Sequence, residues 1–428
     1  MKIKIIEGID QLDNKALDVA FDVSGESLDY SSYCLTERGK ELWEGALSNR
    51  AGSIKKELLE LDALAREKGY PGIRVLCEAT GVYHRRLLKV ANKLGMKTAL
   101  ISGEAVNMTQ VVQSNDYIKS DEKDPKTMLL VSKVGKPLKD RNLSGGWLVM
   151  RQLNLEYERN QCDGTRFKNR IRQGLFELFP DLGFKSQWIF ESRASIAIAE
   201  LYGFNPYRII DAGRSGFTQK LRRRKLRKQT INRLWEYAKQ STIMLEDKGI
   251  TDCLEDEIRE LHAHLQNLLS KRLELRSRMV AELEKLHRKG SVNIDPHAAP
   301  VGPFMLARTF AETGPLSDFI NSKKLLRYAG LNITCRSSGT FKGQDKIAKK
   351  GRARLRRCLQ QASLKLVVKG GLYGEYFHAK KASGKSGNQA MVAVSRKLLK
   401  MLFGLERSGG VYNAERVFQN QLPLRQAA

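Results

Sequence analysis

Two adjacent serines, Ser337 and Ser338, stand in a polar stretch that could carry out chemistry on a phosphate group. The stretch covers residues 331–357, is punctuated by glycines, and leads into a dense run of lysines and arginines. Backbone amides and basic side chains bind phosphates, and a serine hydroxyl held beside a phosphodiester can act as a nucleophile. Taken locally, the stretch equally allows a serine that only bonds the backbone of its own loop.

Basic residues in two parts of the chain are candidates for contacts with a nucleic-acid backbone. The first group follows the serines, in a loop and at the start of a helix predicted over residues 355–368, and consists of Lys349, Lys350, Arg352, Arg354, Arg356 and Arg357. We expect the arginines to stay outside, because the apolar positions of that helix form its core face. The second group lies in the run at residues 219–228 and consists of Arg222, Arg223, Arg224 and Lys225. A disordered loop is the alternative for this run, but helical sequence flanks it.

Four carboxylates stand where a strand ends or a helix begins, and together they could hold a metal ion. Asp22 and Glu78 each lie at the end of a predicted strand, whereas Asp121 and Asp124 are three residues apart in a first helical turn. Catalytic groups collect at the C-terminal ends of strands in open α/β sheets, and clustered carboxylates bind one or two hard cations such as Mg²⁺. Each acid also has an ordinary alternative, as a complement to a helix N-terminus or as a solvated charge.

A mixed α/β sheet is needed to position these acids. Alternating or apolar runs predict strands at residues 16–23, 28–35, 41–46, 73–77 and 97–101, and 3.6-residue periodicity predicts helices at residues 53–68 and 83–94. Strands that alternate with helices after an initial meander predict a mixed sheet.

The remainder of the chain is predicted to be mostly helical. Apolar residues at positions 254, 258, 261, 265, 268, 275 and 279 give residues 254–286 the spacing of a coiled coil. This helix could pair with a second subunit or fold back in an intramolecular antiparallel hairpin, and the pattern leaves both open. A glycine turn at Pro300–Pro303, followed by a helix over residues 304–311, resembles a helix-hairpin-helix layout that contacts DNA phosphates.

The composition predicts a polyanionic partner. The 428 residues contain 75 Lys and Arg against 47 Asp and Glu, a net charge of +28, and the basic residues are clustered, which favours DNA or RNA. The six cysteines are scattered without a CxxC pair, which argues against a zinc site or a disulfide framework and predicts a reducing cytoplasm. No signal peptide or membrane span is expected.

Several motifs occur in a specific order. They are FDVSGESLD (21–29), CEATGVYHRRL (77–87), KSDEKDP (119–125), PVGPFMLARTFAETG (300–314), YAGL (328–331), SSG (337–339), KKG (349–351) and RRCL (356–359). With them the chain resembles the DEDD transposases of bacterial insertion sequences, the IS110 group, over about residues 16–135 and 296–412. It departs from the family pattern at Ser120 and Pro125, but neither change removes a carboxylate, and proline is tolerated in a first helical turn.

The resemblance implies a domain order and a set of site residues. An N-terminal extension (1–15) would precede a RuvC-like, ribonuclease-H-type domain (16–138), a helical basic insert with a coiled coil (139–290), a mostly α transposase domain (291–412) and a tail (413–428). The acidic tetrad of the family falls on Asp22, Glu78, Asp121 and Asp124, and its nucleophile falls on Ser338, with Ser337 as the alternate. Asp18 competes with Asp22, but the spacing of the motif favours Asp22.

The resemblance also implies cofactors and partners. The tetrad would hold Mg²⁺ or Mn²⁺, and the partners would be donor DNA, target DNA and a noncoding bridge RNA that pairs with both. The active form would be a homo-oligomer, a dimer or a tetramer, with a site composed between protomers, in the bacterial cytoplasm and associated with the nucleoid. Two alternatives remain at this stage: a metal-dependent RuvC-like Holliday-junction nuclease that uses water, and an inactive nucleic-acid-binding protein.

Overall fold

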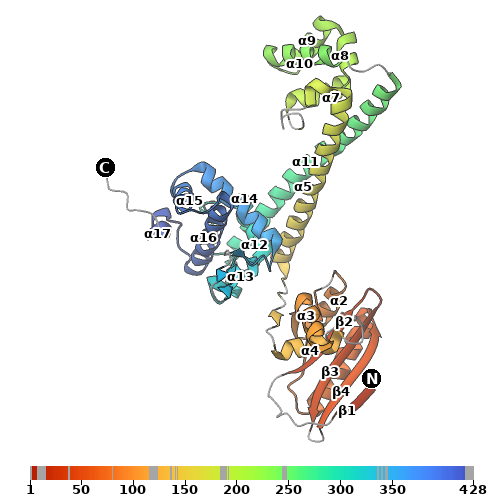
Figure 1. Ribbon diagram of the computed structural model, residues 1–428, viewed down its shortest axis with the longest axis vertical. Helices are drawn as coiled ribbons and strands as arrows, with labels where there is room; N and C mark the ends of the chain where they lie inside the picture. The colour runs from red at the N-terminus through yellow and green to blue at the C-terminus, as the bar shows by residue number, and fades with distance from the viewer. Residues whose placement is uncertain are drawn as a thin grey trace. The chain divides into compact units, whose positions relative to one another are not determined.

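The structure is a computed structural model that describes residues 2–6, 16–36, 39–79, 81–114, 124–134, 137–139, 141, 143–183, 190, 192–242, 248–334, 337–338, 341–342 and 346–419. The chain forms two compact units, Met1–Asn142 and Leu143–Ala428. The first is built on a mixed α/β sheet and the second is mostly helical, so both expectations are confirmed (Figure 1). Within the described ranges, no helix is long and apolar enough to cross a membrane.

A seven-stranded sheet forms the first unit, in the order β1-β4-β3-β2-β5-β6-β7. The strands are β1 (Lys2–Ile6), β2 (Leu17–Val23), β3 (Ser27–Thr36), β4 (Gly39–Ser48), β5 (Ile73–Glu78), β6 (Lys97–Ile101) and β7 (Leu138–Lys139). β2, β5 and β6 run parallel, and the other pairs are antiparallel. The arrangement is compatible with a RuvC-like domain. β1 lies in the segment predicted as an extension, where it adds an edge strand beside β4.

Each face of this sheet is covered by a separate pair of helices. The helices are α1 (Ala51–Glu67), α2 (His84–Lys93), α3 (Gly103–Ser114) and α4 (Asp124–Val134). Because side chains alternate along a strand, Val19 and Phe21 of β2 enter the core beneath α1 and α2. Ala20 enters the opposite core, with Met128 of α4. Asp22, two residues after Ala20, therefore lies on the side covered by α3 and α4.

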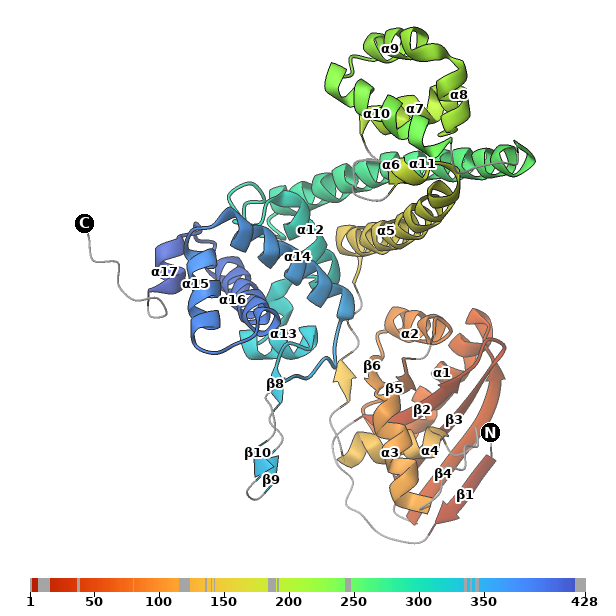
Figure 2. The ribbon, with the colours of Figure 1, turned by 45° about the horizontal axis from the view of Figure 1, so that its top comes forward.

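Two long helices, α5 (Gly145–Leu178) and α11 (Lys248–Arg288), pack side by side in the second unit (Figures 1 and 2). They are antiparallel, since Gly174 lies against Ile258 and Gly146 lies against Leu286. The stripe predicted on α11 faces α5, with side chains such as Leu265 and Leu275 fully buried. This pairing corresponds to the intramolecular alternative raised by the sequence.

Short helices between α5 and α11 form a compact group, which we call the tip module (residues 180–242). They are α6 (Pro180–Gly183), α7 (Arg193–Tyr202), α8 (Pro206–Asp211), α9 (Gly213–Arg223) and α10 (Lys228–Ser241). Their apolar side chains share one core with the ends of α5 and α11. Glu255 of α11, whose side chain is 1% exposed, bonds Arg208 at 2.8 Å and the amide of Asn205 at 3.0 Å, which fixes α8 on α11.

The imidazole of His262, on α11, is buried against the tip module. It is buried against Phe204, and burial lowers its pKa from the ordinary 6.5. The folded state thus favours the neutral ring, whose contribution to stability is complete above pH 6.5 and is lost as the pH falls through the lower folded pKa. We expect the urea midpoint to fall on acidification below pH 6.5, and His262→Gln to reduce this dependence. His264→Gln, on the exposed side of α11, is the control and should leave the profile unchanged.

The C-terminal helices pack on the other end of α5 and α11 and share one core with them. They are α12 (Pro303–Thr313), α13 (Ser322–Ala329), α14 (Ala353–Lys369), α15 (Leu372–Ala382), α16 (Gly387–Ser408) and α17 (Ala414–Phe418). α12, the helix of the predicted hairpin layout, is buried at every position from Met305 to Thr313. α17 falls in the segment predicted as a tail, yet its Phe418 packs edge-on against Tyr373.

A buried ionic network ties α5 to α12 and α14. Arg308 of α12, whose side chain is 2% exposed, pairs with Glu158 of α5 and donates to Asn154 at 3.1 Å. Arg308→Met removes one partner of a buried ion pair, so the free energy of unfolding should fall by about 3 to 5 kcal/mol in urea titrations. Arg357 pairs with the same Glu158 but is 57% exposed, and Arg357→Gln should cost about 1 kcal/mol or less. Equal losses in the two variants would contradict this.

Candidate active site

Asp22 and Glu78 lie side by side at the C-terminal ends of β2 and β5. The parallel register ends with the pair Phe21–Cys77, so Asp22 and Glu78 occupy the next positions on strands about 4.8 Å apart. Ala20 and Leu76, two residues earlier on each strand, belong to the core covered by α3 and α4. Asp22 and Glu78 therefore share that face of the sheet, as the sequence predicted for strand-end acids.

Asp29 was not among the predicted site residues, but it lies directly opposite Asp22 on the antiparallel strand β3. Asp29, Asp22 and Glu78 thus form a row of carboxylates across three adjacent strands. Like charges placed opposite one another in a sheet are destabilising unless a cation or a proton lies between them. Both acids occur in the motif FDVSGESLD, but their opposition follows only from the register that the turn at Ser24–Ser27 sets.

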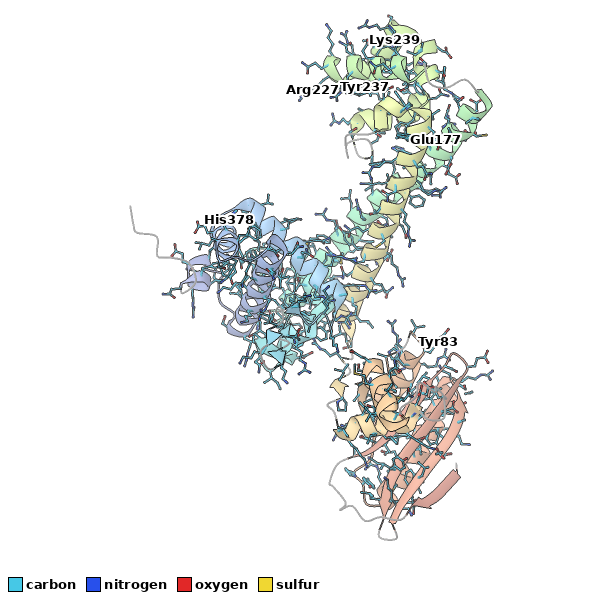
Figure 3. The ribbon with its side chains drawn as sticks, in the orientation of Figure 1. Tyr83, Glu177, Arg227, Tyr237, Lys239 and His378 are labelled. Carbon is cyan, nitrogen blue, oxygen red and sulfur yellow. The ribbon has the colours of Figure 1, made fainter. Side chains whose placement is uncertain are left out.

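Glycine at position 103 makes room for the carboxylate of Glu78. A Cβ built on Gly103, the first residue of α3, would lie 2.0 Å from Glu78 Oε1. A side chain at position 103 would therefore have to displace Glu78 from the strand end. Tyr83, in the turn that follows β5, is 53% exposed, and its ring lies over Gly25 of the β2–β3 turn (Figure 3). The strand-end acids are thus flanked by an exposed aromatic ring.

The other two members of the predicted tetrad are placed differently. Asp124 begins α4, which covers the same face of the sheet, and accepts a hydrogen bond from the amide of Gln110. Asp121 lies outside the described residues. Within the described ranges, no three His, Cys, Asp or Glu residues are close enough together to hold a metal ion. The oxygen donors of Asp22, Asp29 and Glu78 are nevertheless the kind that Mg²⁺ and Mn²⁺ prefer.

Asp18, the competing acid on β2, is bonded by side chains that hold the fold together. Its carboxylate binds Arg74 through two hydrogen bonds of 2.6 and 2.7 Å and accepts another from Ser132 of α4 at 2.7 Å. The same contact raises the pKa of Arg74, chiefly through the hydrogen bond to Asp18. Asp18 therefore joins α4 to the sheet at the opposite end of β2 from Asp22.

Ser337 and Ser338 lie in a β-hairpin, so the prediction of a loop at this position was wrong. β9 (Ser337–Ser338) pairs with β10 (Phe341–Lys342), and β8 (Ile333–Thr334) pairs with β11 (Lys346–Ile347), both antiparallel. The polar sequence hid these strands, which are only two residues long and are defined by backbone pairing. Ser338 pairs with Phe341 and is the last residue of its strand before the turn. Figure 2 shows the hairpin projecting from the helices on which it is based.

Close backbone packing fixes the base of this hairpin. Gly330 and Gly351 both have positive φ, and a Cβ on Gly351 would lie 2.5 Å from the carbonyl oxygen of Tyr328. The amide of Lys349 donates to the carbonyl of Gly330 at 3.1 Å, and that of Arg352 donates to Tyr328 at 3.0 Å. Only glycine allows the two backbones to approach this closely. The glycines of the YAGL and KKG motifs thus hold the hairpin on α13 and α14.

Two of the arginines at the start of α14 form hydrogen bonds within the protein. Arg352 bonds the buried carboxylate of Glu312 at 2.9 Å, and Arg356 donates to the carbonyl of Ala329 at 3.0 Å. The expectation that all of them stay outside was therefore wrong for Arg352 and Arg356, which are half-buried because these acceptors lie beneath the hairpin. Arg354 is exposed, as are Lys349 and Lys350.

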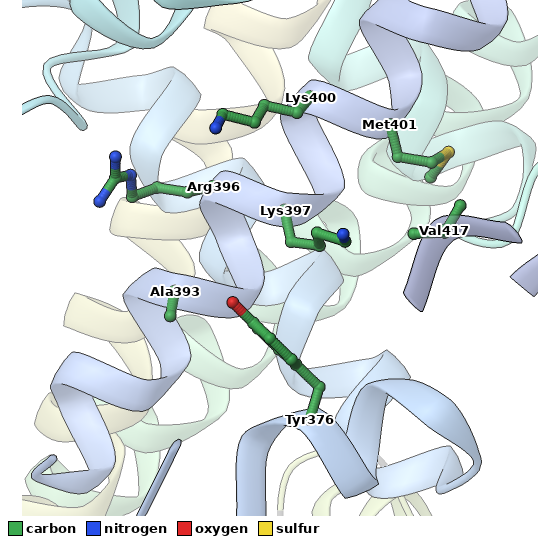
Figure 4. A pocket seen from close by; sticks show the side chains of 7 residues that line it. All are labelled: Tyr376, Ala393, Arg396, Lys397, Lys400, Met401 and Val417. Carbon is green, nitrogen blue, oxygen red and sulfur yellow. The ribbon is translucent and has the colours of Figure 1, made fainter. Parts of the chain in front are cut away.

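Two further basic surfaces lie elsewhere in the second unit. In the tip module, the predicted residues Arg222, Arg223, Arg224 and Lys225 are all exposed, and they lie at the end of α9 and in the turn after it. The second surface is a pocket among α15, α16 and α17, where Arg396 and Lys400 point the same way (Figure 4). Burial and the neighbouring Lys400 lower the pKa of Lys397 in this pocket. Both surfaces suit anions such as phosphate.

Comparison with known proteins gives two family matches and one relative. A DEDD family model described as "Transposase" matches residues 19–180, which include all four predicted acids. A second model, described as "Transposase IS116/IS110/IS902 family", matches residues 299–378, which include both serines. The chain is also similar to a Streptomyces coelicolor protein named "Insertion element IS110 uncharacterized 43.6 kDa protein". The two are 22% identical over 384 residues, covering 89% of this chain and 92% of the relative.

Proposed function

The chain belongs to the IS110 family of transposases, enzymes that cleave and rejoin DNA, and we propose that Ser338 is its nucleophile. The observation that carries this proposal is the backbone pairing of Ser338, the last residue of β9, with Phe341 of β10, within the stretch that the IS110 family model matches. Backbone pairing helps to position a nucleophile, and small displacements of a nucleophile reduce the rate strongly.

The reaction would transfer one phosphoryl group twice. The hydroxyl of Ser338 gives up its proton and its oxygen attacks the phosphorus of one DNA strand, while the bond from phosphorus to the leaving deoxyribose oxygen breaks and that oxygen takes a proton. The strand is then held as a phosphoserine ester. A hydroxyl end of the second DNA attacks the same phosphorus and releases the serine. The number of phosphodiester bonds is conserved, so no external energy source is needed.

The acids would hold a divalent metal ion, which is usual for DEDD transposases. We assign this role to Asp22, Glu78, Asp121 and Asp124, with Mg²⁺ or Mn²⁺ as the ion. When bound, such an ion neutralises the charge that develops on the phosphoryl oxygens. The carboxylates themselves orient the phosphate and can accept the serine proton. The repulsion between Asp22 and Asp29, which face each other across β2 and β3, supports a cation at this end of the sheet.

The proposal also includes a guide RNA and an assembly of several protomers. A noncoding bridge RNA would pair with donor and target DNA, and acids of one protomer would serve the serine of another in a dimer or tetramer. The net charge of +28 supports binding of two DNA molecules and an RNA. Treating the assembled complex with ribonuclease before adding DNA should abolish recombination if the RNA selects the sites. Recombination that survives the treatment would leave site selection to the protein.

The test is to trap the intermediate. The full-length protein is incubated with DNA that carries the ends of its element, its flanking transcript and Mg²⁺, then denatured and digested for peptide mapping. An adduct at Ser338 supports the proposal. Strand cleavage without an adduct would favour the junction nuclease that uses water, and DNA binding without cleavage would favour the inactive binding protein.

A further inference from the structure

α9 of the tip module has the position of a groove-reading helix. It follows α8 with almost no intervening chain, because Ala212 ends α8 and Gly213, at φ +67°, begins α9. α10 packs against both helices. In both ribbon views, α9 lies at the outer edge of the module, away from α5 and α11 (Figures 1 and 2). Two helices joined by a short glycine turn, with the second exposed, form the layout of DNA-binding helix-turn-helix elements.

From this layout we propose that α9 enters the major groove of duplex DNA. Only Phe217 and Leu221 of its side chains are buried, and both point into the module core. Gly216 and Thr218 are half-buried, and the other residues of α9 are exposed. An α-helix with its side chains is about 10 to 12 Å across, which matches the width of about 12 Å of the major groove of B-form DNA.

The exposed face of α9 carries positive charge that no acid among the described residues neutralises. Arg214, Arg222 and Arg223 line one open groove along the helix, and none of them has an ion-pair partner within the described ranges. No Asp or Glu occurs between Ala212 and Asn232. The neighbouring Arg224, in contrast, forms an ion pair with Glu200 at 2.9 Å. These exposed charges suit an external polyanion, and the phosphates of DNA supply negative charge at regular intervals.

Short polar side chains lie between these arginines. Ser215, Thr218 and Gln219 line the same groove, at helical spacings that place them on one face with Arg222. Hydroxyl and amide groups of this length bond base edges, and glutamine and arginine are the side chains that match adenine and guanine in the major groove. Arginines alone would be sufficient for contacts with phosphate. The combination indicates contact with base edges as well as with the backbone.

Duplex DNA fits this face better than RNA. The major groove of A-form RNA is deep and narrow and does not admit a helix, whereas single-stranded RNA is bound largely by stacking on aromatic rings. The groove along α9 is lined by arginines and by residues with short polar or amide side chains, without an aromatic ring. The proposal rests on DNA being a substrate of the enzyme and is independent of Ser338 and of the acids.

The experiment compares two variants of the full-length protein that lose the same charge. One is Arg222→Gln with Arg223→Gln on α9, and the control is Arg193→Gln with Lys239→Gln on other helices of the tip module; Lys239 is labelled in Figure 3. All four side chains are exposed, so thermal unfolding should be unchanged in both variants. The probe is a fluorescent 40-base-pair duplex, titrated at several salt concentrations beside a duplex RNA of the same length.

We expect the α9 variant to bind duplex DNA about tenfold or more weakly at physiological salt. The slope of log affinity against log salt should fall by about 2, for two lost phosphate contacts. The control should keep both values near those of the wild type, and RNA affinity should not change. In footprinting, wild type should protect guanine N7, a major-groove atom, at a patch that the α9 variant leaves exposed.

Three results would overturn the proposal: an equal loss in the control pair, a loss confined to RNA, or unchanged protection of guanine N7. The Ser338→Ala variant separates this proposal from the proposed nucleophile. It should retain the α9 footprint even though it forms no adduct. If Ser338→Ala still formed an adduct, the assignment of the nucleophile would fail while the inference about α9 would stand on its own measurements.

Discussion

Replacing Ser338 with alanine is expected to abolish the covalent protein–DNA adduct and to reduce strand exchange by a factor of about 10³ or more. The substitution removes the attacking oxygen and leaves no group in the same place that can form the ester. The hairpin should be unaffected, because its strands are held by backbone pairing between β9 and β10. DNA binding should persist. The measurements are adduct yield on a denaturing gel and the rate of strand exchange.

Ser337→Ala is the matched control, since it removes a hydroxyl from the adjacent position of the same strand. It should keep adduct formation within a few-fold of wild type. If Ser337→Ala loses the adduct and Ser338→Ala keeps it, the nucleophile is Ser337. If both variants cleave DNA and neither forms an adduct, water is the nucleophile and the protein acts as a nuclease.

Asp22→Asn and Glu78→Gln should each lower cleavage by about 10³-fold at the Mg²⁺ concentration that half-saturates the wild type. Each change keeps the size of the side chain but removes a negative charge from the row at the ends of β2 and β5. Weaker metal binding follows, so raising the Mg²⁺ or Mn²⁺ concentration should recover part of the activity. Removal of one carboxylate also relieves repulsion, so stability without metal should stay the same or rise. Cleavage rates against metal concentration and urea midpoints provide the test.

Asp18→Asn is the control for these variants, because Asp18 lies on the same face of the same strand. Its carboxylate is already satisfied by Arg74 and Ser132. The substitution should lower stability and leave the metal concentration for half-maximal cleavage unchanged. A shift in metal dependence for Asp18→Asn, together with normal cleavage by Asp22→Asn, would move the site along β2 and refute the assignment.

Local patterns predicted much of this fold. The alternation of Val19 and Phe21 with polar neighbours identified β2, and the apolar run at Ile73–Cys77 identified β5, because a strand buried on both faces has few polar residues. The long stripe on α11 was equally visible. These elements bury side chains at a fixed period, and the period can be read from the sequence alone.

Contacts between distant residues could not be predicted in this way. The pairing of Arg308 with Glu158 joins helices that are about 150 residues apart, and neither residue is distinguished from a surface charge by its neighbours. The strands around Ser338 were missed because they are only two residues long, too short for a periodic pattern. Asp29 was missed although its partner Asp22 was found, because the opposition of the two acids depends on the register of the β2–β3 hairpin.

The antiparallel pairing of α5 and α11 has a consequence for how such enzymes can diversify. Since Gly174 lies against Ile258, the chain leaves α5 and returns to α11 at neighbouring points. The two ends of the intervening segment, which contains the tip module, therefore lie close together. A short loop could replace it, or another domain could be grafted there, without disturbing the core around α12. If the tip module binds DNA as proposed, an element could change what its transposase recognises there and keep the rest of the enzyme unchanged.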